Sequence, residues 1–327
     1  MREPHFWRNY DPRSRDAAPM TRLLLTPLSL AYSWAGKRRI ERATPVDVGL
    51  PVICVGNLTL GGAGKTPVTA AVRQRLVARG VRAASLSRGY GGSREGPLKV
   101  DAVVHAVAEV GDEPVMLAAL GEAWIAKDRV AGAKAMKAAG VQVVVMDDGH
   151  QNPAVKKTLS LVVIDAMEPF GNGHVFPKGP LREPVARGLA RADAVVLMGE
   201  GEPPEELKGA NKPVLRARLA PLAKLAAGRY VAFAGIGRPE RFFDGLQGME
   251  GVELVEAVPY PDHHAFTASD LDYLKKVSSE RDARLITTDK DHVRLSAEMK
   301  AIVMRASVEA RFEDEAALAA LLSRVTP

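Results

Sequence analysis

The sequence contains very little cysteine and few aromatic residues. Its single cysteine, Cys54, excludes an intrachain disulfide and any zinc site built on several thiolates. We expect Cys54 to be a buried strand residue, because it lies in the apolar run 51–55. Aromatic residues make up only 5% of the chain, so the core must consist mostly of Val, Leu, Ala and Ile. The lack of cysteine pairs fits a reducing cytoplasm.

Long apolar runs are also absent. The longest uncharged one, residues 23–36, is too short to cross the hydrocarbon core of a bilayer, which takes about 20 residues in a helix. The residues before it are polar and rich in arginine, which is not the pattern of a signal peptide. The sequence therefore predicts no transmembrane span.

What the chain does contain is an ordinary globular composition. Of its 327 residues, 46% are hydrophobic and 26% are charged, which excludes an intrinsically disordered protein. At a typical ~150 residues per domain, this length indicates about two domains. Lys and Arg outnumber Asp and Glu by 45 to 39, and the net charge of +6 favours anionic partners. The basic residues are dispersed without interleaved aromatics, so we expect neither a nucleic-acid partner nor an obligate protein partner.

The apolar run near the N-terminus allows two interpretations. It is flanked by basic side chains at positions 22, 37–39 and 42. One interpretation is a helix packed in the core. The other is a helix in the membrane interface, with Tyr32 and Trp34 at the level of the lipid headgroups and the basic residues paired with anionic lipid. The flanking charges favour the second, so we interpret residues 1–42 as a membrane-interface segment.

Strand-length apolar runs alternate with helical patterns along the rest of the chain. Continuous apolar strands between helices are typical of a parallel sheet covered by helices on both faces, so the expected fold class is α/β. The strands expected before residue 200 are 52–55, 81–86, 141–146, 159–164 and 194–197, and the helices are 67–78, 112–120 and 128–139.

A second α/β alternation follows a change of composition. Prolines and glutamates interrupt regular structure over 200–224, and we place a domain boundary there. The sequence thus predicts a core domain over 43–224 and a smaller α/β domain over 225–327. In the smaller domain we expect strands 229–234, 252–257, 285–287 and 301–304, and helices 239–246, 269–277 and 313–322.

The strongest motif follows the first strand. Residues 56–66 (GNLTLGGAGKT) lie between a strand and a helix, which is the context of a phosphate-binding loop. Backbone N–H groups and the helix N-terminus favour bound phosphate there, while Lys65 can reach the β- and γ-phosphates and Thr66 can ligate Mg²⁺. The strict sequence pattern of such loops has a glycine at the position of Thr59. The paired glycines 61–62 and the position between a strand and a helix make up for this missing glycine. The alternative interpretation is a glycine-rich turn that binds no ligand. The candidate nucleotide-binding residues are Thr59, Leu60, Gly61, Gly62, Ala63, Gly64, Lys65 and Thr66.

Two acids follow the apolar run 141–146. Asp147 and Asp148 stand where a strand beside a phosphate loop delivers a Mg²⁺-associated carboxylate, although an isolated pair of this kind could also form a turn or a cap. Neither 211–214 nor 288–291 matches the pattern of a guanine-specific site. The sequence therefore favours ATP over GTP.

Four more polar segments interrupt the α/β pattern. Residues 87–92 follow a strand, and the acids Asp112 and Glu113 begin a helix, where they are either a base and a metal contact or capping residues. The Gly/Pro-rich segment 170–184 is of the kind that shapes a binding loop. The histidines of 261–264 lack the spacing of a metal site, so we expect one of them to partner an acid at the domain cleft or to lie on the surface.

Taken in order, these segments resemble the tetraacyldisaccharide 4′-kinase family, the lipid A 4′-kinases. Each segment is modest alone, but seven in the same order over most of the chain are specific. The phosphate loop without its first glycine is itself a feature of that family. The segments that carry the resemblance are 55–59 with 65–67, 87–91, 111–114, 147–151, 179–184, 262–264 and 287–291.

The resemblance implies a P-loop NTPase-like sheet domain and an activity. The activity is transfer of the γ-phosphate of ATP, with Mg²⁺, to the 4′-hydroxyl of a tetraacylated glucosamine disaccharide 1-phosphate in lipid A biosynthesis. The resemblance also implies a peripheral enzyme on the cytoplasmic face of the inner membrane. Its partners would be the anionic acylated substrate and an anionic membrane surface bound through residues 22–42.

The resemblance also implies roles for single residues. Asp112 is the candidate base for the 4′-hydroxyl; because a free Asp has a pKa of ~3.9, it needs support, which His263 from the second domain would supply on domain closure. Lys65 would neutralise the phosphates. The implied Mg²⁺ ligands are Thr66, Asp147, Asp148 and Glu113. The implied substrate-binding residues are Tyr90, His150, Gln151, Arg182 and Glu183.

Two other functions stay open from the residues alone. One is a kinase of the same loop class that acts on a soluble small molecule, although it would have no need of the basic-flanked apolar segment. The other is a non-catalytic nucleotide-switch ATPase, in which Asp112 and His263 would be structural.

Overall fold

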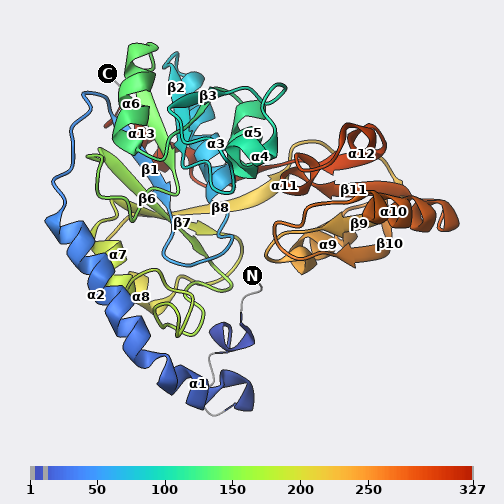
Figure 1. The fold of residues 1–327 in the computed structure, drawn as a ribbon, viewed down its shortest axis with the longest axis horizontal. Coiled ribbons are helices and arrows are strands. Elements are labelled where there is room, and N and C mark those ends of the chain that lie inside the picture. Colours follow the sequence, from blue (N-terminus) through green and yellow to red (C-terminus); the bar gives the residue numbers. More distant parts are fainter. Residues whose placement is uncertain (1–3, 10–13, 326–327) are drawn as a thin grey trace.

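The computed structural model describes residues 4–9 and 14–325. They form a large lobe built on a nine-stranded sheet and a small lobe built on a four-stranded sheet, with two helices along the outside of the large lobe (Figure 1). The expected α/β class is confirmed, because the central strand pairs of the large sheet and all strand pairs of the small one are parallel.

The large sheet has the strand order β13-β8-β7-β6-β1-β5-β2-β4-β3. Only its outer pairs, β3 with β4 and β13 with β8, are antiparallel. Its strands are β1 (Val52–Gly56), β2 (Ala83–Ser87), β3 (Leu98–Val100), β4 (Ala123–Ile125), β5 (Val143–Asp147), β6 (Leu159–Asp165), β7 (Ala194–Met198), β8 (Val214–Pro221) and β13 (Val308–Phe312). Its helices are α3 (Lys65–Val77), α4 (Val107–Val110), α5 (Asp112–Ala119), α6 (Arg129–Ala138), α7 (Val185–Ala190), α8 (Glu205–Lys208) and α13 (Glu315–Leu322).

The apolar runs recognised in the sequence form the centre of this sheet. Every residue of β1, β5, β6 and β7 is buried, as expected for strands covered on both faces. Along β1, Ile53 and Val55 belong to the core layer that includes Leu76 of α3, and Val52 and Cys54 belong to the opposite layer. Cys54 is fully buried, as predicted, and its burial raises the pKa of the thiol to about 11.

The small lobe consists of a second parallel sheet with helices. Its strand order is β10-β9-β11-β12. The strands are β9 (Gly228–Ala234), β10 (Val252–Pro259), β11 (Arg284–Thr288) and β12 (Val303–Ala306), and the helices are α9 (Pro239–Gln247), α10 (Ala268–Glu280), α11 (Asp289–His292) and α12 (Ala297–Ile302).

The small lobe does not extend to the end of the chain. β13 pairs with β8 in the large sheet, and Leu318, Leu321 and Leu322 of α13 pack in the core of the large lobe. The domain that we expected over 225–327 is therefore an insertion between β8 and β13, and the boundaries predicted from the sequence differ from the structure at this point. The apolar and polar residues of β13 (VEARF) alternate, which is itself a strand signal in the sequence.

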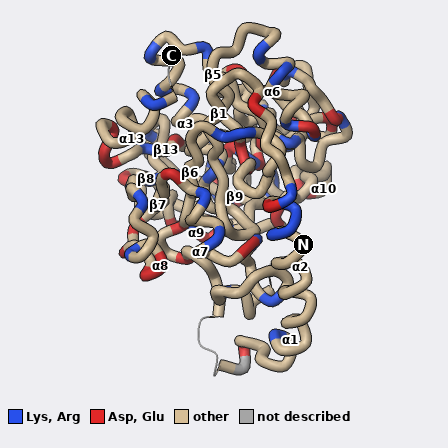
Figure 2. Tube along the Cα trace, turned by 90° about the vertical axis from the view of Figure 1, so that its left-hand side faces the viewer, with Lys and Arg blue, Asp and Glu red and all other residues tan. Residues whose placement is uncertain are grey.

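The N-terminal segment forms η1 (His5–Trp7), η2 (Arg15–Ala17), α1 (Pro19–Leu24) and α2 (Thr26–Arg42). In α2 only Ser29 is buried, and α1 has no buried residue, so these helices are not packed in a core. α1 and the start of α2 project from the body of the molecule, with few charged residues along them (Figure 2). No helix in the described part of the chain has the length and apolar character needed to cross a membrane. The large exposed apolar side chains of α1 and α2 are Met20, Leu23, Leu24, Leu28, Leu30, Tyr32 and Trp34.

Candidate active site

The glycine-rich loop runs from the end of β1 into α3. Gly64 has a φ of +80°, a conformation that favours glycine, and α3 begins at the next residue, Lys65. The backbone N–H of Leu60 donates to the carbonyl of Pro180 at 2.7 Å, and that of Arg182 donates to the carbonyl of Leu58, also at 2.7 Å. The loop without its first glycine is thus held by the Pro180–Arg182 segment.

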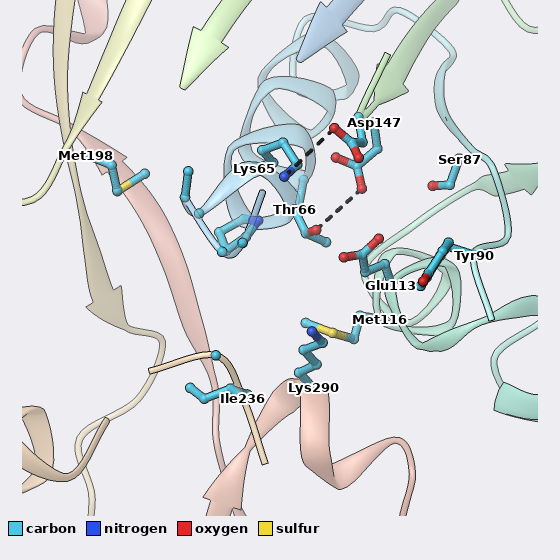
Figure 3. A pocket seen from close by; sticks show the side chains of 18 of the residues that line it. Lys65, Thr66, Ser87, Tyr90, Glu113, Met116, Asp147, Met198, Ile236 and Lys290 are labelled. Atoms are coloured by element: carbon cyan, nitrogen blue, oxygen red, sulfur yellow. Dashed lines mark hydrogen bonds and ion pairs between the residues drawn. The ribbon is translucent and has the colours of Figure 1, made fainter. Parts of the chain in front are cut away.

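The loop opens into a cavity of about 1460 Å³ that both lobes line. From the large lobe, Lys65, Thr66, Glu113 and Asp147 face it; from the small lobe, Lys290 does so (Figure 3). This volume is large for a nucleotide alone, since typical small-molecule pockets have about 300–1,000 Å³. The cavity can therefore hold a nucleotide and part of a second substrate.

Asp147 lies against the hydroxyl groups at the start of α3. Thr69 Oγ1 donates to Asp147 Oδ1 at 2.9 Å, and Thr66 Oγ1 to Asp147 Oδ2 at 3.4 Å. Burial, together with the charges of Glu113 and Asp148, raises the pKa of Asp147 to about 7. Such a buried, poorly compensated carboxylate beside a phosphate loop is a fitting partner for a cation.

The donor set fits Mg²⁺ only together with phosphate. Among the described residues, no group of three or more His, Cys, Asp or Glu side chains could hold a metal without further ligands. Mg²⁺ is usually bound through one or two carboxylates plus substrate phosphate oxygens and water. Thr66 and Asp147 supply that minimal protein share, and the side chain of Glu113 lies beside them in the cavity (Figure 3).

Asp148 is engaged by cations. Arg182 Nη1 lies 2.9 Å from Asp148 Oδ1, and Lys65 Nζ lies 3.8 Å from the same atom. Burial raises the pKa of Asp148, but the charges of Lys65 and Arg182 outweigh burial and hold it below its ordinary value. Asp148 is thus paired with cations of the protein, whereas Asp147 contacts the hydroxyl groups of Thr66 and Thr69. Arg182, expected to contact substrate, instead donates to Asp148 and to the carbonyl of Thr59 at 3.0 Å.

Asp112 and His263 meet where the lobes face each other. His263 Nδ1 lies 3.1 Å from Asp112 Oδ2, and Arg294 Nε donates to the same oxygen at 3.1 Å. Asp112 is 5% exposed. Burial raises its pKa, but the hydrogen bond from His263 and the charges of Lys290 and Arg294 outweigh burial and lower the pKa well below the ordinary value.

The outer nitrogen of His263 has a partner as well. Lys290 Nζ lies 3.2 Å from His263 Nε2. Arg294 Nη2 lies 3.2 Å from the other ring nitrogen, Nδ1, so a cation faces each side of the imidazole. His263 has a φ of +60°, which is uncommon for a residue with a side chain and is seen at sites with a defined role.

The comparison with known proteins now decides the family. A family model described as tetraacyldisaccharide-1-P 4′-kinase matches residues 21–326. The chain belongs to this family. Its relatives include the tetraacyldisaccharide 4′-kinase of Hyphomonas neptunium, 56% identical over 99% of this chain and 98% of the relative, and that of Maricaulis maris, 51% identical over 99% of this chain and 96% of the relative.

A solved structure shares the fold. The structure of LpxK from Aquifex aeolicus in complex with ATP superimposes with a TM-score of 0.73 at 25% identity, and the match covers 93% of this chain and 99% of the other. The P-loop kinase fold that the sequence implied is thus confirmed. That structure holds ATP, and the family uses ATP and Mg²⁺, which agrees with the cofactors expected here.

Two residues expected to bind the substrate of a tetraacyldisaccharide 4′-kinase have other surroundings. His150 is 2% exposed and does not line the cavity; its Nε2 lies 2.9 Å from the carbonyl of Gly188, and burial lowers its pKa to about 4. His150 packs closely against Gly56 at the start of the loop. A Cβ atom built on Gly56 would lie only 2.5 Å from the Cβ of His150. Glu183 is 4% exposed and accepts from Arg191 at 2.6 Å. The structure therefore places His150 outside the lining of the cavity.

The other residues expected to bind substrate, Glu183 included, line the cavity. Tyr90 is 71% exposed, with its ring centroid 6.4 Å from that of His263. Gln151 donates to the carbonyl of Asn57 at 2.9 Å, which ties it to the start of the loop. Tyr90 is free to meet a substrate, whereas Gln151 is held by the protein.

The arginines and the lysine that the small lobe contributes to the site were not among the residues predicted from the sequence. Arg238 Nη1 donates to Asp165 Oδ2 at 2.6 Å, and Arg241 donates to the same carboxylate across the lobes. A signal existed for Asp165, which ends β6 at the same sheet edge as Asp147, and for Lys290, which lies in the segment 287–291. No local pattern marks Arg294.

Proposed function

We propose that this chain transfers the γ-phosphate of ATP to the 4′-hydroxyl of a tetraacylated glucosamine disaccharide 1-phosphate, the reaction of the tetraacyldisaccharide 4′-kinase family. The observation that carries this function is one cavity shared by the phosphate loop and the Asp112–His263 pair, in a chain that matches the family over residues 21–326. Phosphoryl transfer needs alignment and charge neutralisation more than covalent help, and this cavity supplies both.

The large lobe would bind the nucleotide. Loop N–H groups and the N-terminus of α3 bind the triphosphate, and Lys65 neutralises its β- and γ-oxygens. Thr66 and Asp147 would hold Mg²⁺, which supplies charge neutralisation on the phosphates when it is bound. Arg182 acts on the loop by fixing Asp148, which lies beside Lys65.

The small lobe would complete the site on the acceptor side. Asp112 and His263 act together: His263 Nδ1 lies 3.1 Å from Asp112 Oδ2, and the pair accepts the proton of the attacking hydroxyl. Burial raises the pKa of Asp112, but the hydrogen bond from His263 and the charges of Lys290 and Arg294 outweigh burial and hold this pKa low, so the carboxylate is a weak base. Since the pair joins residues of two lobes, proton acceptance is available only when the lobes are as close as in this structure, which also limits transfer to water.

The helices α1 and α2 would place the enzyme on its substrate's membrane. Their exposed leucines and Trp34 suit insertion into a lipid interface, and Arg38 lies over the Trp34 ring at 5.0 Å, where its charge can meet anionic headgroups. Tyr32, Arg39 and Ile40 of α2 also line the cavity. The proposed location is therefore peripheral, on the cytoplasmic face of the inner membrane.

The test is transfer of radiolabelled γ-phosphate to a tetraacyl disaccharide 1-phosphate in detergent micelles, with the products separated by chromatography. We expect label on the lipid with the wild-type chain and none with Lys65→Ala. A soluble small-molecule kinase or a nucleotide switch would leave the lipid unlabelled, and that result would refute the proposed function.

A further inference from the structure

Lys290 projects into the cavity beside the Asp112–His263 pair. Its Nζ lies 3.2 Å from His263 Nε2 and 3.4 Å from Asp262 Oδ1. Figure 3 shows its side chain on the opposite side of the cavity from Lys65. Nucleotide binding by the large lobe does not account for a cation at this place.

The helix that carries Lys290 is fixed on both sides of it. Asp289 accepts from Ser307 Oγ at 2.8 Å and pairs with Arg305 at 3.2 Å. Asp291, which is fully buried, accepts from the backbone N–H of Gly235 at 3.0 Å. Both neighbouring acids are thus held by other partners, and they leave the ammonium of Lys290 directed at the cavity.

The ammonium of Lys290 lies close to the place that the reacting hydroxyl must occupy. A hydroxyl that gives its proton to the Asp112–His263 pair must place its oxygen within hydrogen-bond distance of that pair. Because Nζ is only 3.2 Å from His263 Nε2, this oxygen and the phosphoryl group that it attacks come within reach of the ammonium. Lys290 has three N–H donors on a flexible stem, so it can leave Asp262 for a more highly charged partner.

We propose that Lys290 is a further catalytic residue, whose ammonium binds the oxygens of the transferring phosphoryl group from the acceptor side. The proposal rests on the proposed kinase function. A lone pair of the 4′-oxygen forms the new bond to the γ-phosphorus, and the bond to the β,γ-bridging oxygen breaks with its electron pair staying on ADP. The hydroxyl proton passes to the Asp112–His263 pair. Lys290 keeps its protons and balances the charge on the three equatorial oxygens.

If Lys290 has this role, removal of its ammonium should lower kcat much more than it raises KM. The charge on the equatorial oxygens meets the ammonium only when the acceptor and the γ-phosphate are aligned, so the contact is strongest in the transition state. Removing such a contact lowers kcat, whereas removing a contact that holds the ground state raises KM.

The experiment compares Lys290→Met and Lys290→Arg in the lipid-labelling assay. We expect Lys290→Met to lower kcat about 10²-fold, with both KM values within about threefold of wild type. Lys290→Arg, which keeps the charge, should recover part of the loss. Lys276→Met, a change at an exposed lysine of α10, is the matched control and should keep wild-type turnover. Circular dichroism and ATP binding check that the variants fold.

A second comparison separates catalysis from support of His263. In a His263→Ala background we expect Lys290→Met still to lower kcat, by about tenfold, because the ammonium acts on the phosphoryl group itself. An unchanged kcat in Lys290→Met, a change confined to the KM for lipid, or no further loss in the His263→Ala background would each overturn the proposal. A wild-type chain that labels no lipid would refute the proposed function instead, and this role with it.

Discussion

Asp112 Oδ2 lies 3.1 Å from His263 Nδ1, although the two residues belong to different lobes. Asp112 begins α5 in the large lobe, and His263 follows β10 in the small lobe. Arg294 joins them by donating to Asp112 from the segment after α11. The acceptor side of the site thus exists only as an interface between the lobes, whereas the phosphate loop belongs to one lobe.

Replacing Asp112 by Asn should separate transfer from nucleotide binding. The amide cannot accept the proton of the attacking hydroxyl, so we expect a loss in kcat of about 10²-fold or more, with ATP affinity retained because the phosphate loop is untouched. Steady-state labelling and a nucleotide-binding titration measure the two. Glu253→Gln, at an exposed residue of β10, is the control. Near wild-type turnover in Asp112→Asn would remove Asp112 from the mechanism.

Replacing Arg294 by Met should change the pH dependence of transfer. Arg294 and Asp112 are each about 6% exposed in side chain, and the guanidinium lowers the pKa of Asp112 while burial raises it. Without Arg294 the pKa of Asp112 rises, so the acid limb of kcat/KM should move to higher pH. The profile of kcat/KM against pH measures this shift, and an unmoved acid limb would contradict it.

The same variant should also be less stable. Breaking a buried ion pair leaves one charge uncompensated, at a typical cost of about 3 kcal/mol. The lowered pKa means that Asp112 stabilises the fold above its unfolded-state pKa and that this contribution is lost as the pH falls through the folded-state value. Thermal unfolding of wild type and Arg294→Met should therefore differ clearly at neutral pH and converge as the pH falls toward strongly acidic values.

Charges introduced on the exposed face of α1 and α2 should release the protein from anionic vesicles. Leu24 is 74% exposed and Leu28 60% exposed, so Leu24→Glu with Leu28→Glu should leave the fold intact while opposing insertion into lipid. Co-sedimentation with vesicles measures binding. Val77→Glu, at an exposed valine of α3, is the matched control. Equal sedimentation of the double variant and the control would argue against a membrane role for these helices.

Replacing Asp165 by Ala should loosen the contact between the lobes. Asp165 is the common partner of Arg238 and Arg241, and its removal leaves both guanidinium groups without that carboxylate. We expect a larger radius of gyration by small-angle X-ray scattering and a lower kcat, because the Asp112–His263 pair forms less often. Glu205→Ala, at an exposed residue paired within α8, should change neither. An unchanged radius in Asp165→Ala would show that other contacts hold the lobes.

The centre of the fold was predictable because local pattern and burial coincide there. The runs 141–146 and 159–164 are apolar throughout, since both faces of their strands are covered. The strands β8 and β13 were not predicted, because both are partly exposed and prolines stand beside and at the end of β8. The helical run near the N-terminus was recognised, but only the structure excludes its burial in a core.

The candidate site was predictable in part for a related reason. The phosphate loop follows β1 and Asp147 ends β5. In this fold class the carboxyl ends of parallel strands meet at one edge of the sheet, so the meeting of the loop with Asp147 was predictable. Arg294 and Asp112 are 182 residues apart, and no periodicity connects them. The burial of His150 was not predictable, because its position after a strand does not reveal that its side chain turns toward the carbonyl of Gly188.

The return of the chain to the large sheet affects how the protein is made. β8 is paired on its outer side by β13, which lies within the last twenty residues of the chain. During synthesis the nucleotide-binding lobe therefore keeps an unpaired strand edge until the small lobe has been completed. A chain that ends before β13 would retain the phosphate loop and the Asp112–His263 pair and yet expose an aggregation-prone edge.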